Sequence, residues 1–435
     1  MIENSKNEAS GNVVLAAVYL IVGASKLFPA LNMLSIFMVF GGILYCAWQN
    51  QFFKLAPLFI FFNSSILYYA GTAIVDVYFA AYIVIHILKK PLVSVGAHHL
   101  ILAGFSLYCI CVVSAFRFST AISIVLSFSA LAILIEELRN RIIWVQFCKW
   151  YIVALLSATL YGIGNYSEGI SNSLYSTFRY TVTFTDPNYA GFFLSVGLYM
   201  ALFLKRELRS WIRYSVICVS IISILMTISS SALIANAGII VILYFSGMGN
   251  RKVSVSAIGK VIICIIAGAL LLNWAGDVFP GVERTFSRFA EKIVQLNDGG
   301  IASATTDRSI LWKEHLNYFW SQDSLIQILF GGNYLTDRGM DYSKFSVVSH
   351  QVYVDALICF GLVGTALYIV YIIYQLIGKW KVRMTSDENI LSFTLTLLWI
   401  FYSFILSMFP FWGFMVFLMK DVRNEVNTDA YKKLV

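Results

Sequence analysis

The chain has 435 residues, of which 59% are hydrophobic and only 12% are charged, and its formal net charge is +8. A soluble domain usually carries about 25% charged residues, so this composition excludes an ordinary water-soluble protein and indicates that lipid covers most of the surface. A backbone inside a bilayer must satisfy its own hydrogen bonds. Because the apolar runs are close to the length of a spanning helix, we expect helices and not a barrel.

The apolar runs predict an all-α bundle of about twelve to fourteen membrane-spanning helices, since about 20 apolar residues cross a bilayer. The first run follows a polar stretch that lacks the basic region and cleavage site of a secretory signal, so we interpret it as a retained span. The expected spans, in chain order, are 12–28, 32–48, 53–68, 70–88, 97–115, 119–136, 143–163, 189–204, 212–228, 230–247, 257–276, 351–378, 390–408 and 409–420.

Basic residues gather in alternate connections between these runs. The positive-inside rule places these connections, together with both ends of the chain, in the cytoplasm. The positive net charge therefore reports topology and does not indicate nucleic-acid binding. The cytoplasmic set consists of Lys89, Lys90, Arg139, Arg141, Lys149, Lys205, Arg206, Arg209, Arg213, Arg251, Lys252, Lys260, Lys379, Lys381, Arg383, Lys420, Arg423, Lys432 and Lys433.

Two longer connections fall on the opposite, outer side and carry the unusual polar residues. We expect a first set of eleven spans over 1–276, interrupted by a short outer loop at 164–188. A large, slightly acidic outer loop with amphipathic helices occupies 277–349, further spans fill 350–420, and a cytoplasmic tail covers 421–435. The cysteines all lie in or beside apolar stretches, which predicts no disulfide framework.

The shorter outer loop ends in a helix-start signal. Asp186 suits the cap of a helix and Pro187 its first turn. Asn188 follows the proline, and Arg179 is the only basic residue in that loop.

The larger outer loop contains a segment with helical spacing. Asp307 could cap a helix that starts at Arg308. On that helix one stripe is formed, at helical spacing, by Arg308, Trp312, His315 and Phe319. His315 suits either a sugar contact or an ordinary surface position.

A third segment returns the chain to the membrane. His350 lies at the re-entry point, Tyr353 opens the apolar helix, and Asp355 follows about one turn deeper. His350 suits either a catalytic role or a simple cap at the membrane boundary. A carboxylate in an apolar helix is costly unless it is paired or wet, so Asp355 either pairs with an arginine or takes part in function.

Together these elements resemble the O-antigen polymerase and ligase family, the Wzy and WaaL type of membrane glycan transferases. The resemblance covers roughly residues 175–365 and has a consistent order, spacing and side. It implies a GT-C-like helix bundle that acts at the outer face of the bacterial cytoplasmic membrane. The matching elements are Arg179 with Asp186-Pro187-Asn188, Arg308 to Trp312 with Gly331-Gly332, and His350-Gln351-Val352-Tyr353 with Gly361-Leu362-Val363-Gly364.

One element departs from the family pattern. The family often has Ser-Arg-Gly-Ala at the outer start of a later span, where this chain reads Thr227-Ile228-Ser229-Ser230-Ser231-Ala232-Leu233 without an arginine. In the family that arginine is thought to act on the lipid diphosphate. Its absence favours a polymerase over a ligase, and shifts the expected diphosphate contact to Arg179, Arg284, Arg288 or Arg308.

The resemblance implies an inverting glycosyltransferase that needs neither a metal nor a cofactor. In agreement, we find no Asp-x-Asp motif and no clustered His/Cys ligands. The enzyme would transfer a glycan from an undecaprenyl-diphosphate carrier to a sugar hydroxyl of another lipid-linked repeat unit, building O-antigen or capsule. Arginine suits the diphosphate oxygens, and a neutral histidine can take the hydroxyl proton.

The resemblance also implies residue roles and partners. His350 and Arg308 are expected to be catalytic. The expected substrate or diphosphate contacts are Arg179, Asn188, Arg284, Arg288, Trp312, His315, Tyr353 and Asp355. The expected partners are membrane lipids, the lipid-linked oligosaccharide and, by family analogy alone, a polysaccharide chain-length regulator.

Other interpretations stay open. An O-antigen ligase belongs to the same family. A flippase for lipid-linked oligosaccharides, or another transporter, would also need many helices, but transporters are usually built from repeated halves, and the hydropathy shows no repeat. Arg284 and Arg288 also fit an amphipathic helix on the membrane surface. If the chain is a glycan transferase, we expect Arg179, Arg308 and His350 to converge around one outer cavity.

Overall fold

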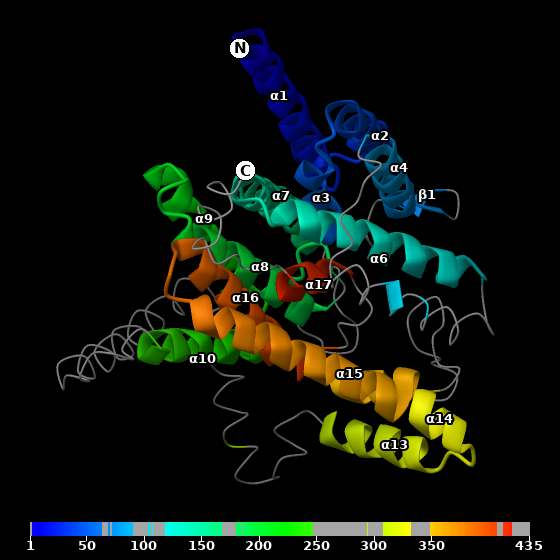
Figure 1. The fold of residues 1–435 in the computed structure, drawn as a ribbon. Coiled ribbons are helices and arrows are strands. Elements are labelled where there is room, and N and C mark those ends of the chain that lie inside the picture. The colour runs from blue at the N-terminus through cyan, green and yellow to red at the C-terminus, as the bar shows by residue number, and fades with distance from the viewer. Residues whose placement is uncertain are drawn as a thin grey trace, which may run out of the picture.

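In a computed structural model, the described residues are 2–62, 68–69, 72–89, 103–104, 107, 118–167, 180–184, 186–246, 294, 308–331, 349–406 and 412–419. Within these ranges the chain is almost wholly helical, which confirms the all-α part of the predicted fold class (Figure 1). The exception is one short antiparallel pair, β1 (Tyr68–Tyr69) with β2 (Thr72–Ala73).

Most helices follow the apolar runs, with ends that differ from the predicted ones by a few residues. The run expected at 12–28 begins instead at Ile2, and the run expected at 53–68 is divided into Phe52–Lys54 and Ala56–Phe62, with Tyr68 in a strand. The spans predicted at 97–115 and 257–276 lie almost entirely outside the described residues. The helices are α1 (Ile2–Ala24), α2 (Leu31–Gln49), η1 (Phe52–Lys54), α3 (Ala56–Phe62), α4 (Ile74–Lys89), α6 (Phe118–Leu138), α7 (Arg141–Ser167), α8 (Pro187–Phe203), α9 (Ser210–Met226), α10 (Ser230–Ser246), α13 (Arg308–Trp320), α14 (Leu325–Phe330), α15 (Val352–Val382), α16 (Asp387–Ser403) and α17 (Trp412–Met419).

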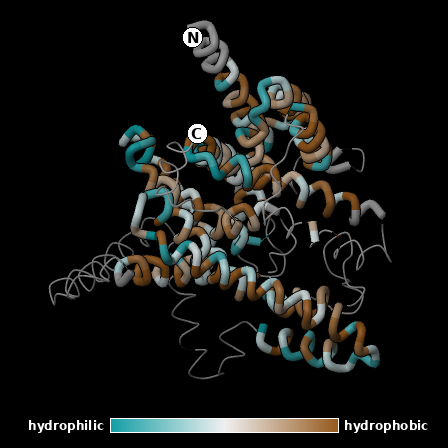
Figure 2. Tube along the Cα trace, in the orientation of Figure 1, coloured by the Kyte–Doolittle hydropathy of each residue, from teal (hydrophilic) through white to brown (hydrophobic). Residues whose placement is uncertain are grey.

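Three described helices are long and apolar enough to cross a membrane, namely Leu31–Gln49, Arg141–Asn165 and Val352–Val382. Large apolar side chains are exposed on two of them, with Trp48 at 80% and Leu367 at 67%. Water-exposed apolar surface of this extent is unfavourable, so these helices are compatible with a lipid environment. Figure 2 shows the hydrophobic colour along α2 and α15, whereas hydrophilic residues gather at helix ends and on α13.

An aromatic core joins α8, α16 and α17. Phe192 and Phe193 on α8 pack against Phe414 on α17, with ring centroids 4.7 and 4.8 Å apart. The ring of Tyr402 on α16 lies edge-on to Phe192 at 5.3 Å. This packing fixes the first two turns of α8 against the last turn of α16.

The long helix α15 is interrupted near its start. Gly361 has φ 64° and ψ −169°, values outside the helical region. Residues 352–360 therefore form a separate first part of α15, and α14 packs against this interruption. In Figure 1, α13 and α14 lie beside this end of α15.

Candidate functional site

Polar residues from the two predicted outer loops meet around the C-terminal end of α16. Arg308, the first residue of α13, donates from Nη1 to the carbonyl of Ile405 at 3.0 Å. Ser403 on α16 donates to the hydroxyl of Tyr353, near the start of α15, at 2.9 Å. The ring of Tyr353 also packs on Phe404, 5.0 Å between centroids. The starts of α13 and α15 are thereby held at one end of α16.

The start of α8 reaches the same end of α16 and is joined to α10. Asp186 caps α8 as predicted, because its Oδ1 accepts from the backbone N of Asn188 at 2.7 Å and from Asn188 Nδ2 at 2.9 Å. Pro187 occupies the first turn. Ser229 donates to Asn188 Oδ1 at 2.7 Å and accepts from the backbone N of Ala232 at 3.2 Å. The segment that lacks the family arginine is therefore bonded directly to the Pro-Asn element.

The predicted stripe on α13 turns inward. His315 is fully buried, with Nδ1 2.7 Å from the carbonyl of Leu311, and Phe319 is buried at the end of the stripe. Trp312 donates from Nε1 to the carbonyl of Ser349 at 2.9 Å. The stripe is thus confirmed as a face, and it attaches α13 to the segment just before α15. Its complete burial makes His315 a packing residue in this structure.

His350 lies within electrostatic reach of groups from two other elements, α13 and the cap of α8. Burial lowers its pKa below the ordinary value, and the Arg308 guanidinium lowers it further. The Asp186 carboxylate opposes this by raising the pKa, and His315 adds a smaller lowering effect. The imidazole is therefore neutral at pH 7, the form that accepts a proton.

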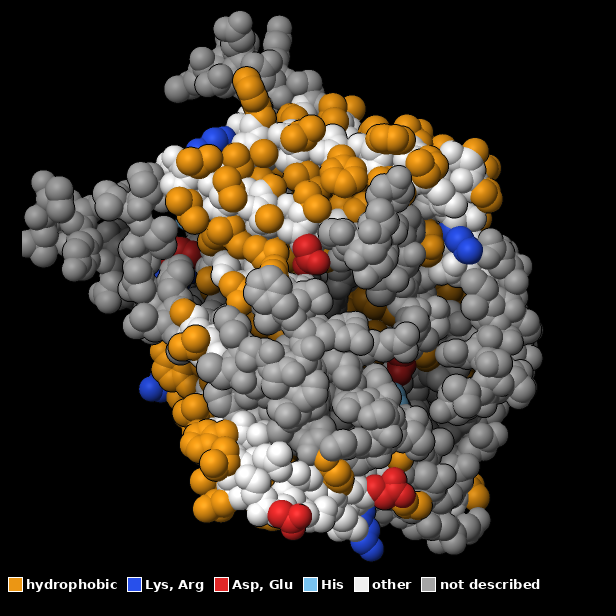
Figure 3. Space-filling model, turned by 90° about the vertical axis from the view of Figure 1, so that its right-hand side faces the viewer, with side chains coloured by type: hydrophobic (Ala, Val, Ile, Leu, Met, Phe, Trp, Pro, Cys, Tyr) orange, Lys and Arg blue, Asp and Glu red, His pale blue; other side chains and the backbone are white. Residues whose placement is uncertain are grey.

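A recess opens on the side of the molecule that contains α13, α14 and the start of α15. Figure 3 shows this side, and deep in the recess a histidine and an acidic side chain lie together. Among the described histidines, His86 and His315 are buried, whereas His350 is partly exposed.

Backbone strain concentrates in the same region. Among the described residues, the non-glycine residues with positive φ are Asn50, Val182, Ile228 and His350. Val182 precedes α8, Ile228 precedes α10 and His350 precedes α15. A left-handed backbone is a genuine outlier for β-branched residues, and such strain clusters at functional sites.

Asp355 has a specific partner. Its side chain is 4% exposed, and its Oδ1 accepts from the Ser349 hydroxyl at 2.5 Å. Its carboxylate lies in the first turn of α15, where negative charge is favourable. Asp355 therefore belongs to the framework beneath His350 and does not present its charge to the recess.

Several predicted site residues lie outside the described residues. These are Arg179, Arg284 and Arg288, so their predicted convergence with Arg308 and His350 stays a prediction. The residue after Arg179 is described: the backbone N of Tyr180 donates to the carbonyl of Met226 at 3.2 Å, just before the Ser229 segment.

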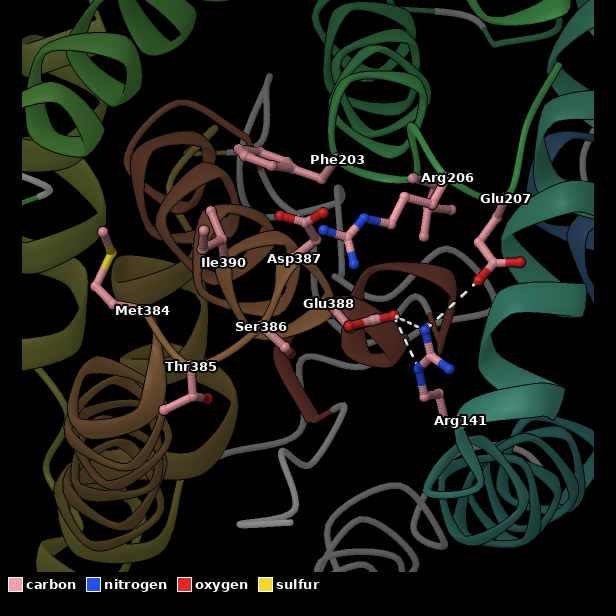
Figure 4. Close-up of a pocket in the computed structure, with 11 residues that line it drawn as sticks. Arg141, Phe203, Arg206, Glu207, Met384, Thr385, Ser386, Asp387, Glu388 and Ile390 are labelled. Atoms are coloured by element: carbon pink, nitrogen blue, oxygen red, sulfur yellow. Dashed lines mark hydrogen bonds and ion pairs between the residues drawn. The ribbon is translucent and has the colours of Figure 1, made fainter. Parts of the chain in front are cut away.

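A pocket of about 470 Å³ lies among the predicted cytoplasmic connections, far along the chain from these loops (Figure 4). Arg141 pairs there with Glu388 at 2.8 Å and with Glu207 at 3.5 Å, and Lys205 pairs with Asp387 at 3.7 Å. These ion pairs join the connections before α7, between α8 and α9, and between α15 and α16. We interpret the pocket as a junction of loops.

Sequence reasoning missed the roles of two residues around His350. Asp186 was interpreted as a helix cap and as part of the Pro-Asn element, and its electrostatic effect on His350 was not foreseen. Ser349, which contacts both Trp312 and Asp355, was not singled out. The one feature of the sequence that could have pointed to Ser349 was its position next to His350. Within the described residues, no group of three His, Cys, Asp or Glu side chains could hold a metal ion.

No protein-family model matches the chain, and no curated protein sequence matches it.

Proposed function

We propose that this chain is a multi-pass membrane polymerase of surface polysaccharide, with the Arg308–His350 recess as its active site. It takes a glycan from a polyprenyl-diphosphate carrier and adds it to a sugar hydroxyl of a second lipid-linked unit. The observation that carries the proposal is that Arg308 and Tyr353 hold the starts of α13 and α15 at one end of α16, which brings the Arg308 guanidinium within electrostatic reach of His350. Arg308 and His350 both come from loops predicted to lie on the outer side of the membrane.

The reaction requires a base for the acceptor and positive charge for the donor. The acceptor hydroxyl oxygen attacks the anomeric carbon of the donor glycan, and His350 takes the hydroxyl proton. The bond between that carbon and the diphosphate oxygen breaks, and the lipid diphosphate leaves with the bonding electrons. A single displacement of this kind inverts the anomeric configuration.

Arg308 suits the departing diphosphate. A guanidinium presents five N–H donors in a planar fork that matches phosphate oxygens. The carbonyl of Ile405 holds one arm of Arg308, so the guanidinium is preorganised before substrate arrives.

The chemical class of the reaction can be tested with purified components. The wild-type protein is reconstituted in vesicles with polyprenyl-diphosphate-linked repeat units in a buffer containing a divalent-metal chelator. A ladder of longer lipid-linked glycans supports the polymerase. Transfer only to a different lipid acceptor supports a ligase, and movement of the intact lipid across the bilayer without transfer supports a flippase. Either of these two results would replace the proposal.

A further inference from the structure

Ser349, the residue directly before His350, is the centre of a small hydrogen-bond network. Its hydroxyl donates to Asp355 Oδ1 at 2.5 Å and accepts from the backbone N of Gln351 at 3.1 Å. Its carbonyl accepts from Trp312 Nε1 at 2.9 Å. Ser349 is fully buried. Two elements, α13 and the start of α15, therefore hold Ser349 in place.

The network encloses a backbone conformation that needs support. His350 has φ 55°, in the left-handed region, which is unfavourable for an L-residue although histidine tolerates it better than most. Bonds to Ser349 on one side and to Gln351 on the other restrain this conformation. If the backbone relaxed to an ordinary conformation, the imidazole would leave its place beside Arg308 and Asp186.

We propose that Asp355 and Ser349 are positioning residues, which fix the backbone of His350 and thereby the position of its imidazole. The inference rests on the proposed function, in which His350 is the base. It replaces the substrate contact that the sequence predicted for Asp355, because the carboxylate is buried and directed at the Ser349 hydroxyl. Asp355 acts on the reaction only through the position of His350.

Paired variants separate positioning from substrate binding. Ser349→Ala and Asp355→Leu remove the bond, and we expect each to lower kcat at least about tenfold with little change in KM, since small displacements of a reacting group can cost up to about 100-fold. Ser349→Thr keeps the hydroxyl and Asp355→Asn keeps an acceptor oxygen, so both should retain most of the activity. A rise in KM with kcat preserved would overturn the proposal, because it would indicate direct binding of substrate.

Dependence on His350 is tested in a second background. When His350→Asn has already removed the base, adding Ser349→Ala should not lower the residual rate further. An equal loss in both backgrounds would show that Ser349 acts independently of His350, and would contradict the proposal.

A readout without turnover distinguishes this inference from the proposed function. Diethyl pyrocarbonate acylates histidine, and mass spectrometry follows its rate at His350 in the folded protein. Ser349→Ala and Asp355→Leu should change that rate at least about threefold, while Ser349→Thr leaves it unchanged, because only the first two release the backbone. Unchanged rates in all variants would overturn positioning even if the polymerase is active. Changed rates in a protein without transferase activity would support positioning and refute the polymerase.

Discussion

Gly331, after the last turn of α14, and Gly361, inside α15, lie backbone against backbone, and both have positive φ, 85° and 64°. A Cβ atom on Gly361 would lie 2.4 Å from the nitrogen of Gly331. A Cβ atom on Gly331 would lie 2.2 Å from the carbonyl oxygen of Cys359. Since α13 and α14 are consecutive, this contact sets where the Arg308 end of α13 lies relative to His350.

Alanine at either glycine should therefore destabilise the α14–α15 contact. The left-handed backbone alone costs about 1–3 kcal/mol for a residue with a side chain, and the overlap with backbone atoms adds to it. We expect Gly361→Ala to lower the thermal midpoint in detergent and to reduce activity. Gly378→Ala is the matched control, because a Cβ there meets nothing within 4 Å. Equal midpoints for the two variants would refute this role.

The bond between Ser229 and Asn188 predicts coupling between α8 and α10. Asn188→Ala and Ser229→Ala should each destabilise the protein by about 1 kcal/mol, the net value of a typical hydrogen bond. The double variant should lose less than the sum, with a coupling of about 0.5–1 kcal/mol. Thermal or denaturant unfolding of the four proteins measures the cycle. Strict additivity would mean that the two side chains do not interact.

The environment of His350 predicts a pH profile. Its pKa is held below the ordinary value by burial and by Arg308, so activity should rise with pH through a midpoint below about 6.5. The unfolded chain binds that proton more tightly, so stability falls as the pH drops below that value. Asp186 raises the pKa of His350, and Asp186→Asn should therefore move the acidic limb of the activity profile to lower pH.

Asparagine is as good a helix cap as aspartate, so Asp186→Asn preserves the start of α8. If the acidic limb of the activity profile moved to higher pH, or did not move, the electrostatic interaction between Asp186 and His350 would be contradicted.

Topology can be tested by labelling single cysteines with a membrane-impermeant maleimide. Lys205 and Lys313 are both exposed, and they belong to connections predicted to lie on opposite sides. In a background where all seven native cysteines are replaced by serine, Lys313→Cys should label in intact cells and Lys205→Cys only after permeabilisation. Labelling of both in intact cells would refute the predicted orientation.

The sequence was most informative about features that depend on residues close together in the chain. Apolar runs predicted the described helices, because a span must be long and apolar wherever it packs. The cap at Asp186 and the position of Pro187 were predicted for the same reason, since they depend on residues one or two positions away. The inward stripe of α13 followed from helical spacing alone.

Contacts between distant segments could not be predicted. In the sequence Gly331 and Gly361 belong to separate motifs. Neither motif indicates that the two backbones lie in contact, which is why a glycine is needed at both positions. The same is true of Asp355, whose burial beside Ser349 depends on how α13 covers the start of α15. The left-handed conformation of His350 is likewise imposed by its neighbours, since histidine itself does not require it.

The decisive experiment compares His350→Asn and Arg308→Gln with wild type in the vesicle assay for glycan elongation. Asparagine tolerates the left-handed backbone, so His350→Asn removes the base and spares the fold. We predict a loss of about 100- to 10,000-fold for His350→Asn and about 100- to 1,000-fold for Arg308→Gln, while Arg209→Gln on the predicted cytoplasmic side keeps its activity. A ladder of normal length and rate from either folded site variant would contradict an active site at Arg308 and His350.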